Sequence, residues 1–403
     1  EQLPYEMNVD EDGNFTFTFG DWEWSTADMK TDGTDAAVSG KIKSYLNLRS
    51  GSGTEYEIIG HLLPGVKKDA VFRKGHIITK EDIPVLLSVG KDTIYIWEND
   101  ETMMHENEAA EVLYRMSACG TKKIEADTQS GVSCGTVSKM HPSPVKEGKI
   151  EVIADCDGLL KVDSKKLEKV NSFGELMIAT RHGNTTVKKG DKLAGTRIIP
   201  LVIKKDKLKE ASNICEDGPI LDIKPFVVRK AAIITTGNEV YHGRIQDAFT
   251  PVIEKKIAEF GAQMMFHEVF DDDDKKITDG CLRAIEAGAE IVFCTGGMSV
   301  DPDDKTPLAI KNTGARIVSY GSPVLPGAMF LLSYYDAGDR LVPICGLPGC
   351  AMYNKRTIFD IVLPRLMARD MIYADELAGL GEGGLCLNCD VCTFPNCGFG
   401  KGF

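Results

Sequence analysis

The sequence predicts a doubly wound α/β domain over residues 226–370, with a small β-rich domain and an α+β region before it and a short metal-binding tail after it. Two observations predict the α/β domain. Runs such as VVRKAAIITT and EIVFCT alternate with stretches of helical spacing, which is typical of βα units. These runs are mainly apolar and rich in β-branched residues, which indicates strands that are buried on both faces of a parallel sheet.

The elements of this domain follow in chain order. After the first strand a helix is expected at roughly residues 248–260, followed by the strand MMFHEVF and the helix KKITDGCLRAIEAG. EIVFCT, ARIVSYG, AMFLLSYY and LVPICG are further strands, and AMYNKRTIFDIVLPRLMAR is expected to form a long helix. The carboxylate run 271–274 lies between a strand and a helix, where it suits a solvated helix start.

The chain ahead of this domain divides by composition. Residues 1–60 form an unassigned polar segment, in which FTFTFGDWEW alternates like an edge strand or hairpin. Residues 61–130 and 200–225 predict an α+β linker or dimerisation region that contains the amphipathic stretch HENEAAEVLYRMSACG. Residues 131–199 predict the small β-rich domain, because short strand patterns alternate there with turn residues.

Composition limits the classes of partner. The 403 residues are 43% hydrophobic and 27% charged, which is the balance of a globular protein, and the net charge is −13. This acidity argues against nucleic acid and anionic membrane as general partners. The chain opens with EQLPYEMNVDEDGNF, which lacks the pattern of a secretion signal, so we expect a cytoplasmic protein.

Three glycine-bearing loops each follow a predicted strand. Glycine lets backbone N–H groups approach an anion, and ligands of open α/β sheets bind at the carboxyl ends of the strands. Acidic residues in these loops suit a divalent cation that bridges carboxylates to a phosphate-bearing ligand, although ordinary turns would also use glycine there. The loops span Thr235–Val240, Thr295–Pro307 and Cys345–Cys350, and the acidic residues are Glu239, Asp301, Asp303 and Asp304.

The ordered set TTGNEV, TGGMSVDPDD, PVLPGAMF and GLPG resembles the molybdopterin-binding domain of molybdenum cofactor biosynthesis proteins. HENEAAEVLYRMSACG and VKKGDKLAGTRIIPLVI resemble the preceding domains of the molybdopterin molybdenumtransferase branch, so the resemblance covers about residues 62–369. It implies a homodimer that transfers molybdate, or tungstate, onto the dithiolene of molybdopterin or of its adenylylated form, with Mg²⁺ present.

The resemblance also implies roles for individual residues. Asp304, Glu239 and Ser299 would be catalytic. The ligand would be held by Thr236, Gly237, Gly296, Gly297, Asp301, Asp303, Pro326, Gly327, Gly346, Pro348 and Gly349.

This chain departs from the family pattern at several positions. It has DAF at 247–249 in place of DSN, Leu325 and Ala328 around the Pro-Gly of the third motif in place of a basic residue, and PGCA in place of PGNP. The residues after Arg369 are too few for the family's terminal β-barrel. Two functions therefore stay open, a transferase and a non-catalytic carrier that delivers cofactor to a partner molybdoenzyme. Phosphoanhydride hydrolysis on the same fold is a third.

The tail over residues 380–403 carries four cysteines at short spacing. The pattern suits an iron–sulfur cluster of the [4Fe–4S] type, tetrahedral Zn²⁺, or four free thiols. The predicted ligands are Cys386, Cys389, Cys392 and Cys397. The other eight cysteines are scattered singly, so we expect them to act mainly as small buried hydrophobic residues.

Overall fold

The structure is a computed structural model that describes residues 100–121, 139–299, 301 and 304–402, together with shorter segments between residues 5 and 88. Contacts divide the chain into two compact units, Glu1–Asp100 and Glu101–Phe403.

The described segments of the first unit are short. The FTFTFGDWEW stretch forms the predicted hairpin, because β2 (Phe15–Phe19) pairs antiparallel with β3 (Trp22–Ser25) and also with β1 (Tyr5–Val9). The remaining elements are β4 (Met29–Lys30), β5 (Ser39–Gly40), β6 (Leu46–Arg49), β7 (Ile58–Leu62), a 3₁₀ turn (Lys80–Asp82) and α1 (Ile83–Ser88).

The second unit begins with a β-rich part around one hydrophobic core. A four-stranded sheet in the order β12-β14-β10-β9 packs against α2, whose Leu113 and Met116 are fully buried. The helices are α2 (Glu106–Ala118), α3 (Ser164–Asn171) and α4 (Lys205–Asn213). The strands are β8 (Met103–His105), β9 (Met140–Pro142), β10 (Lys149–Ala154), β11 (Gly158–Val162), β12 (Leu176–Thr180), β13 (Thr185–Val187), β14 (Lys192–Ile198), β15 (Val202–Lys204) and β16 (Leu221–Lys224).

The rest of the second unit is the predicted α/β domain. Its strands are β17 (Lys230–Thr236), β18 (Gln263–Phe270), β19 (Ile291–Thr295), β20 (Arg316–Tyr320), β21 (Leu331–Asp336) and β22 (Leu341–Leu347). Its helices are α5 (Asn238–Tyr241), α6 (Phe249–Ala258), α7 (Asp274–Glu286), α8 (Thr306–Asn312), α9 (Ile358–Met367) and α10 (Ala374–Gly379).

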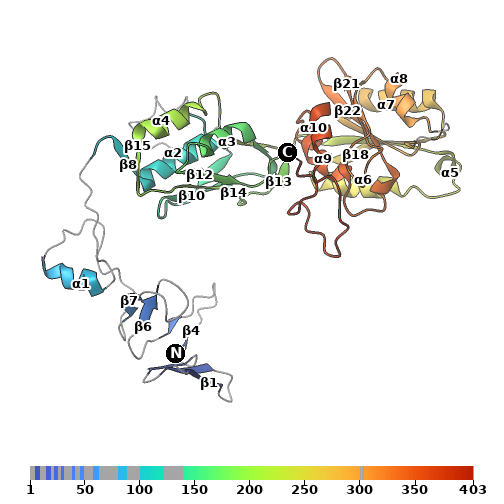
Figure 1. Cartoon of the computed structure of the whole chain (residues 1–403). Coiled ribbons are helices and arrows are strands. Elements are labelled where there is room, and N and C mark those ends of the chain that lie inside the picture. The colour runs from blue at the N-terminus through green and yellow to red at the C-terminus, as the bar shows by residue number, and fades with distance from the viewer. Residues whose placement is uncertain are drawn as a thin grey trace. The chain divides into compact units, whose positions relative to one another are not determined.

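The six strands form one sheet in the order β18-β17-β19-β22-β21-β20, covered by helices on both faces (Figure 1). The first four strands are parallel to one another. β21 pairs antiparallel with β22 on one side and with β20 on the other. Alternate residues enter opposite cores: Ile233 and Phe293 pack with α6 and α9, whereas Ile234 and Cys294 pack with α7 and α8. Burial on both faces explains the continuous apolar runs, and the doubly wound fold class is confirmed.

The last long helix is shorter than the sequence pattern predicts. Helical structure in this stretch is limited to a 3₁₀ turn (Gly349–Ala351) and α9, which begins only at Ile358. Thr357 caps α9, because its side chain accepts a hydrogen bond from the N–H of Phe359 while the Asp360 carboxylate accepts one from the N–H of Thr357. This capping box starts the helix at a defined residue and leaves 352–357 as a loop.

The scattered cysteines follow the expectation in part, since Cys156 and Cys350 are only half-buried. Cys215, Cys281, Cys294 and Cys345 are buried free thiols. Cys119 departs from the expectation, because it is bonded in a disulfide.

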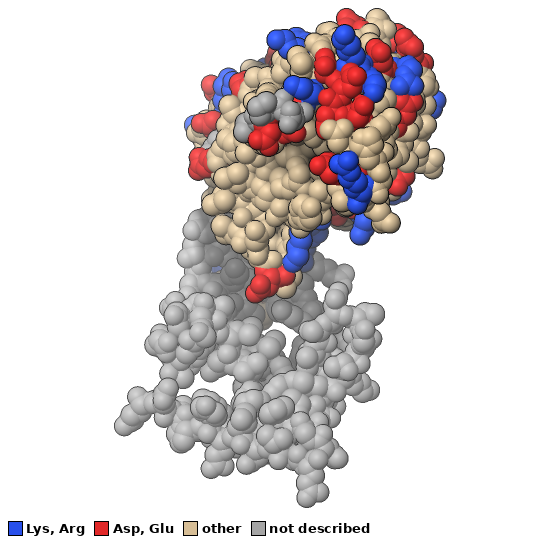
Figure 2. Space-filling view, turned by 90° about the vertical axis from the view of Figure 1, so that its right-hand side faces the viewer, with Lys and Arg blue, Asp and Glu red and all other residues tan. Residues whose placement is uncertain are grey.

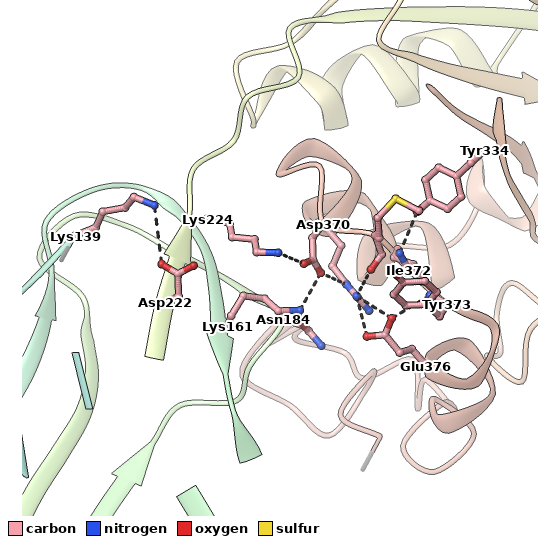
Figure 3. A network of polar contacts seen from close by, with 12 residues as sticks. Lys139, Lys161, Asn184, Asp222, Lys224, Tyr334, Asp370, Ile372, Tyr373 and Glu376 are labelled. Carbon is pink, nitrogen blue, oxygen red and sulfur yellow. Dashed lines mark hydrogen bonds and ion pairs between the residues drawn. The ribbon is translucent and has the colours of Figure 1, made fainter. Parts of the chain in front are cut away.

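A charged network holds the α/β domain against the β-rich part (Figure 3). The buried carboxylate of Asp370 accepts hydrogen bonds from Lys161 at 2.9 Å and from Lys224 at 2.5 Å, both on strands of the β-rich part. The Nε of Arg365 donates to the same carboxylate at 2.6 Å. Burial alone would raise the pKa of Asp370, but these cations lower it to about 2.

Candidate functional site

Five loops meet at one edge of the six-stranded sheet. The parallel strands β17, β18, β19 and β22 all end there, with Thr235 beside Thr295 and Thr295 beside Leu347. Because β21 is antiparallel, the loop that contains Pro326 and Gly327 enters at this same edge. The sheet topology therefore brings together the motifs that the sequence predicted to form one site, and we call this region the loop edge.

Gly296 and Gly297 hold the loop after β19 in a conformation that side chains disfavour. Their φ angles are +83° and +52°, in the left-handed region. A Cβ on Gly296 would collide with the carbonyl oxygen of Thr236, so the β17 and β19 loops touch backbone to backbone. Glycine is required here for this close approach as well as for the turn.

Thr236 lies beneath this contact and is buried. Its hydroxyl donates to the carbonyl oxygen of Thr295 at 3.1 Å and lies 2.9 Å from the hydroxyl of Thr306, which donates to the carbonyl oxygen of Gly296. The side chain of Thr236 therefore ties loops together. The N–H of Gly237 donates to the carbonyl oxygen of Phe270, which joins the ends of β17 and β18.

Ser299 and Asp304 close the same loop on itself. The carboxylate of Asp304 accepts a hydrogen bond from the backbone N–H of Ser299 at 2.7 Å. The hydroxyl of Tyr320 lies 3.3 Å from the carbonyl oxygen of Met298 and donates to it from β20. Asp304 thus occupies a backbone donor that an incoming anion would also use.

Carboxylates face one another across the loop edge. Burial raises the pKa of Asp272, and the nearby charges of Glu239, Asp304 and Asp271 raise it further. The carboxylate of Asp272 accepts a hydrogen bond from the N–H of Asn238 at 3.2 Å, which holds it beside α5. Figure 2 shows acidic side chains on this end of the domain beside a broad surface without charged residues.

Asp272 belongs to the run 271–274, for which the sequence pattern predicts only a solvated helix start. That assignment holds for Asp273, which caps α7 by accepting hydrogen bonds from the N–H groups of Lys275 and Lys276. Asp272 instead points to the loop edge. Its signal in the sequence is its position directly after a strand that neighbours β17.

A second network below the loop edge supports the end of β17. The carboxylate of Asp247 accepts hydrogen bonds from the hydroxyls of Thr235 at 2.9 Å and Thr250 at 2.6 Å, and the Nε2 of His267 lies 3.2 Å from each hydroxyl. Burial raises the pKa of Asp247, but these hydrogen bonds outweigh it and lower the pKa. In the sequence, Asp247 stands out only as the first residue of DAF at 247–249, where the family pattern has DSN.

The other predicted wall residues lie at the same edge. The N–H of Ile358 donates to the carbonyl oxygen of Pro326, which joins this loop to the start of α9. Gly327 and Gly346 leave room for the side chains of Ile358 and Met298. Pro348 and Gly349 follow β22, Asp301 is exposed in the β19 loop, and Asp303 lies outside the described residues.

The tail folds onto the α/β domain beside this wall. Leu325 donates its N–H to the carbonyl oxygen of Gly384 and accepts the N–H of Cys386, both at 2.8 Å. Cys386 and Cys397 are half-buried, whereas Cys389 and Cys392 are exposed. In the part of the chain that the structure describes, no group of three or more His, Cys, Asp or Glu residues is placed to hold a metal ion, so the metal-binding tail stays a prediction.

Within the described ranges, no helix has the length and apolar character needed to cross a bilayer.

Residues 232–368 match the family described as "Probable molybdopterin binding domain", and residues 59–98 match a "Domain of unknown function (DUF8806)".

Curated relatives share parts of the chain. A putative competence-damage inducible protein of Geobacillus sp. is 33% identical over 88 residues, which are 22% of this chain and 20% of that protein. A molybdopterin molybdenumtransferase of Staphylococcus epidermidis is 26% identical over 159 residues, which are 37% of this chain and 38% of that protein. The chain thus spans between about a fifth and two fifths of the length of these relatives.

Among the solved structures that are similar to part of this chain is the tungsten cofactor synthesizing protein MoaB from Pyrococcus furiosus. The identity is 18%, the TM-score is 0.27, and the match covers 35% of this chain and 89% of that one. The family match spans β17 to α9 and contains four motifs of the loop edge. Residues 232–368 of this chain therefore form a domain of the molybdopterin-binding superfamily.

Proposed function

We propose that the loop edge binds molybdopterin or its adenylylated form and that this chain acts in the insertion of molybdenum or tungsten into the dithiolene. The convergence of five loops at one sheet edge, with Gly296 packed directly on the backbone of Thr236, carries this proposal. Glycines at such an edge let a phosphate approach the backbone closely, and the Ser299 N–H would become a donor once Asp304 releases it. The family match of residues 232–368 supports the same ligand class.

The carboxylates of the loop edge fit Mg²⁺ as a partner of that phosphate. Asp272 lies in the field of the carboxylates of Glu239, Asp304 and Asp271. Asp271 is paired with Lys276 at 2.8 Å through its Oδ2, whereas its Oδ1 is buried without a hydrogen-bond partner. Mg²⁺ usually takes one or two carboxylates and completes its shell with water and substrate phosphates, so a complete protein cage is not required. Asp304 and one further carboxylate of the loop edge, that of Asp272 or of Glu239, would hold the ion, which would supply positive charge to the phosphate when bound.

The residues of the loop edge would then have different roles. The backbone of Gly296 and Gly297 would lie against the ligand, and the Ser299 N–H would donate to it once Asp304 releases that donor. Asp304 would turn from the loop to the cation or to the reacting phosphate. Because the contact of Asp304 with the cation or the reacting phosphate would strengthen in the transition state, Asp304 would affect turnover more than binding.

The test measures both properties with the full chain. Asp304→Ala is expected to lower molybdate-dependent release of nucleotide from adenylylated molybdopterin by at least about a hundredfold, while its affinity for the pterin changes by less than about fivefold. Asp339→Ala is the control, because Asp339 lies on the β21–β22 turn at the opposite edge and its side chain is 69% exposed. Equal loss of binding and turnover in Asp304→Ala would contradict a role in chemistry.

A carrier is the second candidate, and Leu325 favours it. Leu325 is 55% exposed at the position where the family pattern expects a basic residue near Pro326, and the tail is hydrogen-bonded to it. Without that cation an oxyanion is held less tightly. A carrier would retain matured cofactor through gel filtration and pass it to a partner molybdoenzyme without turnover. Sedimentation of the same sample tests the predicted homodimer.

A further inference from the structure

A cavity of about 460 Å³ lies between the β-rich part of the second unit and the tail. Its walls are the turn between β12 and β13, which carries Arg181 and His182, and the tail segment that ends at Lys401. Figure 1 places the described C-terminus beside β13, in agreement with this lining. The cavity is of the size that small-molecule sites commonly have.

The charge of this cavity is opposite to that of the chain. Arg181, His182 and Lys401 line it, together with Thr185 and Asn396, and no Asp or Glu is among its described lining residues. The chain as a whole carries a net charge of −13. A basic cavity in an acidic protein is therefore a local feature that the composition does not predict.

The two cations are held differently. The guanidinium of Arg181 donates to the carboxylate of Asp191 at 2.8 Å, and this pair fixes Arg181 on the cavity wall. Lys401 is half-buried, and its ammonium forms no ion pair with a carboxylate of the described residues. Removing an ammonium from water without a counter-charge is costly, so an anion in the cavity would stabilise it.

A smaller cavity of about 130 Å³ adjoins the first and shares Thr185, Pro395 and Lys401 with it. Lys256 and Arg356 line the smaller one, but Asp360 pairs with both of them. Lys401, which lines both cavities, is therefore the lysine or arginine of their walls that no carboxylate of the described residues pairs with.

From this juxtaposition we propose that the cavity between the 181–185 turn and the tail binds a phosphate-bearing small molecule. Lys401 and Arg181 would contact the phosphate, while Thr185 and Asn396 would offer polar groups to the rest of the ligand. The site is separate from the loop edge in its residues, so it does not depend on the function proposed above.

The test is calorimetric titration of the full chain, in about 0.15 M salt to screen surface charge, with inorganic phosphate, pyrophosphate and AMP as probes. Saturable binding is expected, and Lys401→Met should weaken it by at least about tenfold while the affinity of the loop edge for molybdopterin stays unchanged. Met keeps most of the aliphatic length of lysine, so packing is retained. Lys189→Met is the control, because Lys189 is exposed on the same β-rich part and does not line the cavity.

The three probes identify the kind of ligand. If AMP binds more tightly than phosphate, the cavity also accepts a nucleoside. If the two affinities are equal, the site recognises the phosphate group alone. Three results would overturn the proposal: no saturable binding of any probe, equal weakening in Lys189→Met, or a metal–thiolate centre at Cys397 that fills the cavity in the purified protein. Metal analysis of the same sample detects the last of these.

Discussion

At the two ends of the α/β domain, the pKa values of buried or partly buried carboxylates are shifted in opposite directions. At the junction, Asp370 is buried and receives hydrogen bonds from Lys161, Lys224 and Arg365, and its pKa falls to about 2 (Figure 3). At the loop edge, burial and neighbouring carboxylates raise the pKa of Asp272.

We infer that the charges at the junction serve the fold, whereas those at the loop edge serve the proposed site. At the junction Asp370 is paired with three cations, and this network stabilises the contact between two parts of one unit, although burial and the neighbouring charges of Arg365 and Lys224 lower the pKa of Lys161. At the loop edge the carboxylates of Glu239, Asp304 and Asp271 repel that of Asp272, and a bound cation of the kind proposed above would offset this cost. Incomplete electrostatics at a sheet edge is therefore a better guide to the site than the presence of charge.

The largest expected effect is at the junction. Asp370→Asn removes the shared counter-charge of three cations, so we expect the free energy of unfolding to fall by about 3 kcal/mol in urea denaturation. Asp375→Asn is the control, since Asp375 is exposed in the first turn of α10. A change below about 0.5 kcal/mol in Asp370→Asn would mean that the network is not structural.

The loop edge is tested by a glycine pair. Gly296→Ala places a Cβ against the Thr236 carbonyl oxygen, so it should cost about 2–3 kcal/mol of stability and abolish pterin binding. Gly314→Ala is the matched control, because its φ of +84° is nearly the same while its Cβ would meet nothing within 4 Å. The difference between the two variants measures the close approach alone. Equal costs would show that only backbone strain matters.

The pH dependence of unfolding sharpens the contrast at Asp370. Its pKa is about 2 in the folded chain against an ordinary value of 3.8, so the unfolded chain takes up the proton first as the pH falls. This group should contribute about 2 kcal/mol above pH 4, and that contribution should be lost between pH 4 and pH 2. Unfolding curves of wild type and Asp370→Asn should therefore converge at low pH; parallel curves would refute the assignment.

The smallest effect is expected at Asp272. Since its pKa is raised in the folded chain, the ionised form is unfavourable at neutral pH and protonation stabilises the fold. Asp272→Asn should raise stability at pH 7 by less than about 1 kcal/mol and weaken the Mg²⁺ dependence of pterin binding. Asp279→Asn, at an exposed position of α7, is the control. A loss of stability in Asp272→Asn would show that its hydrogen bond to Asn238 dominates.

The fold was largely predictable because its signals are local. Apolar runs such as residues 291–295 and the spacing of α7 report burial of strand and helix directly. Where competing local signals meet, the prediction fails: α9 begins at Ile358 because the capping box of Thr357 and Asp360 overrides the helical pattern before it.

The order of the βα units, the glycine loops after the strands and the superfamily of residues 232–368 can be predicted from the sequence. The proximity of Asp272 to Glu239 and Asp304, the contact of Asp370 with Lys224, and the cavity that Lys401 and Arg181 both line depend on the folded structure. The reason is physical: chain-local patterns record which face of an element is buried, whereas the field at a charged group depends on residues that only folding brings near.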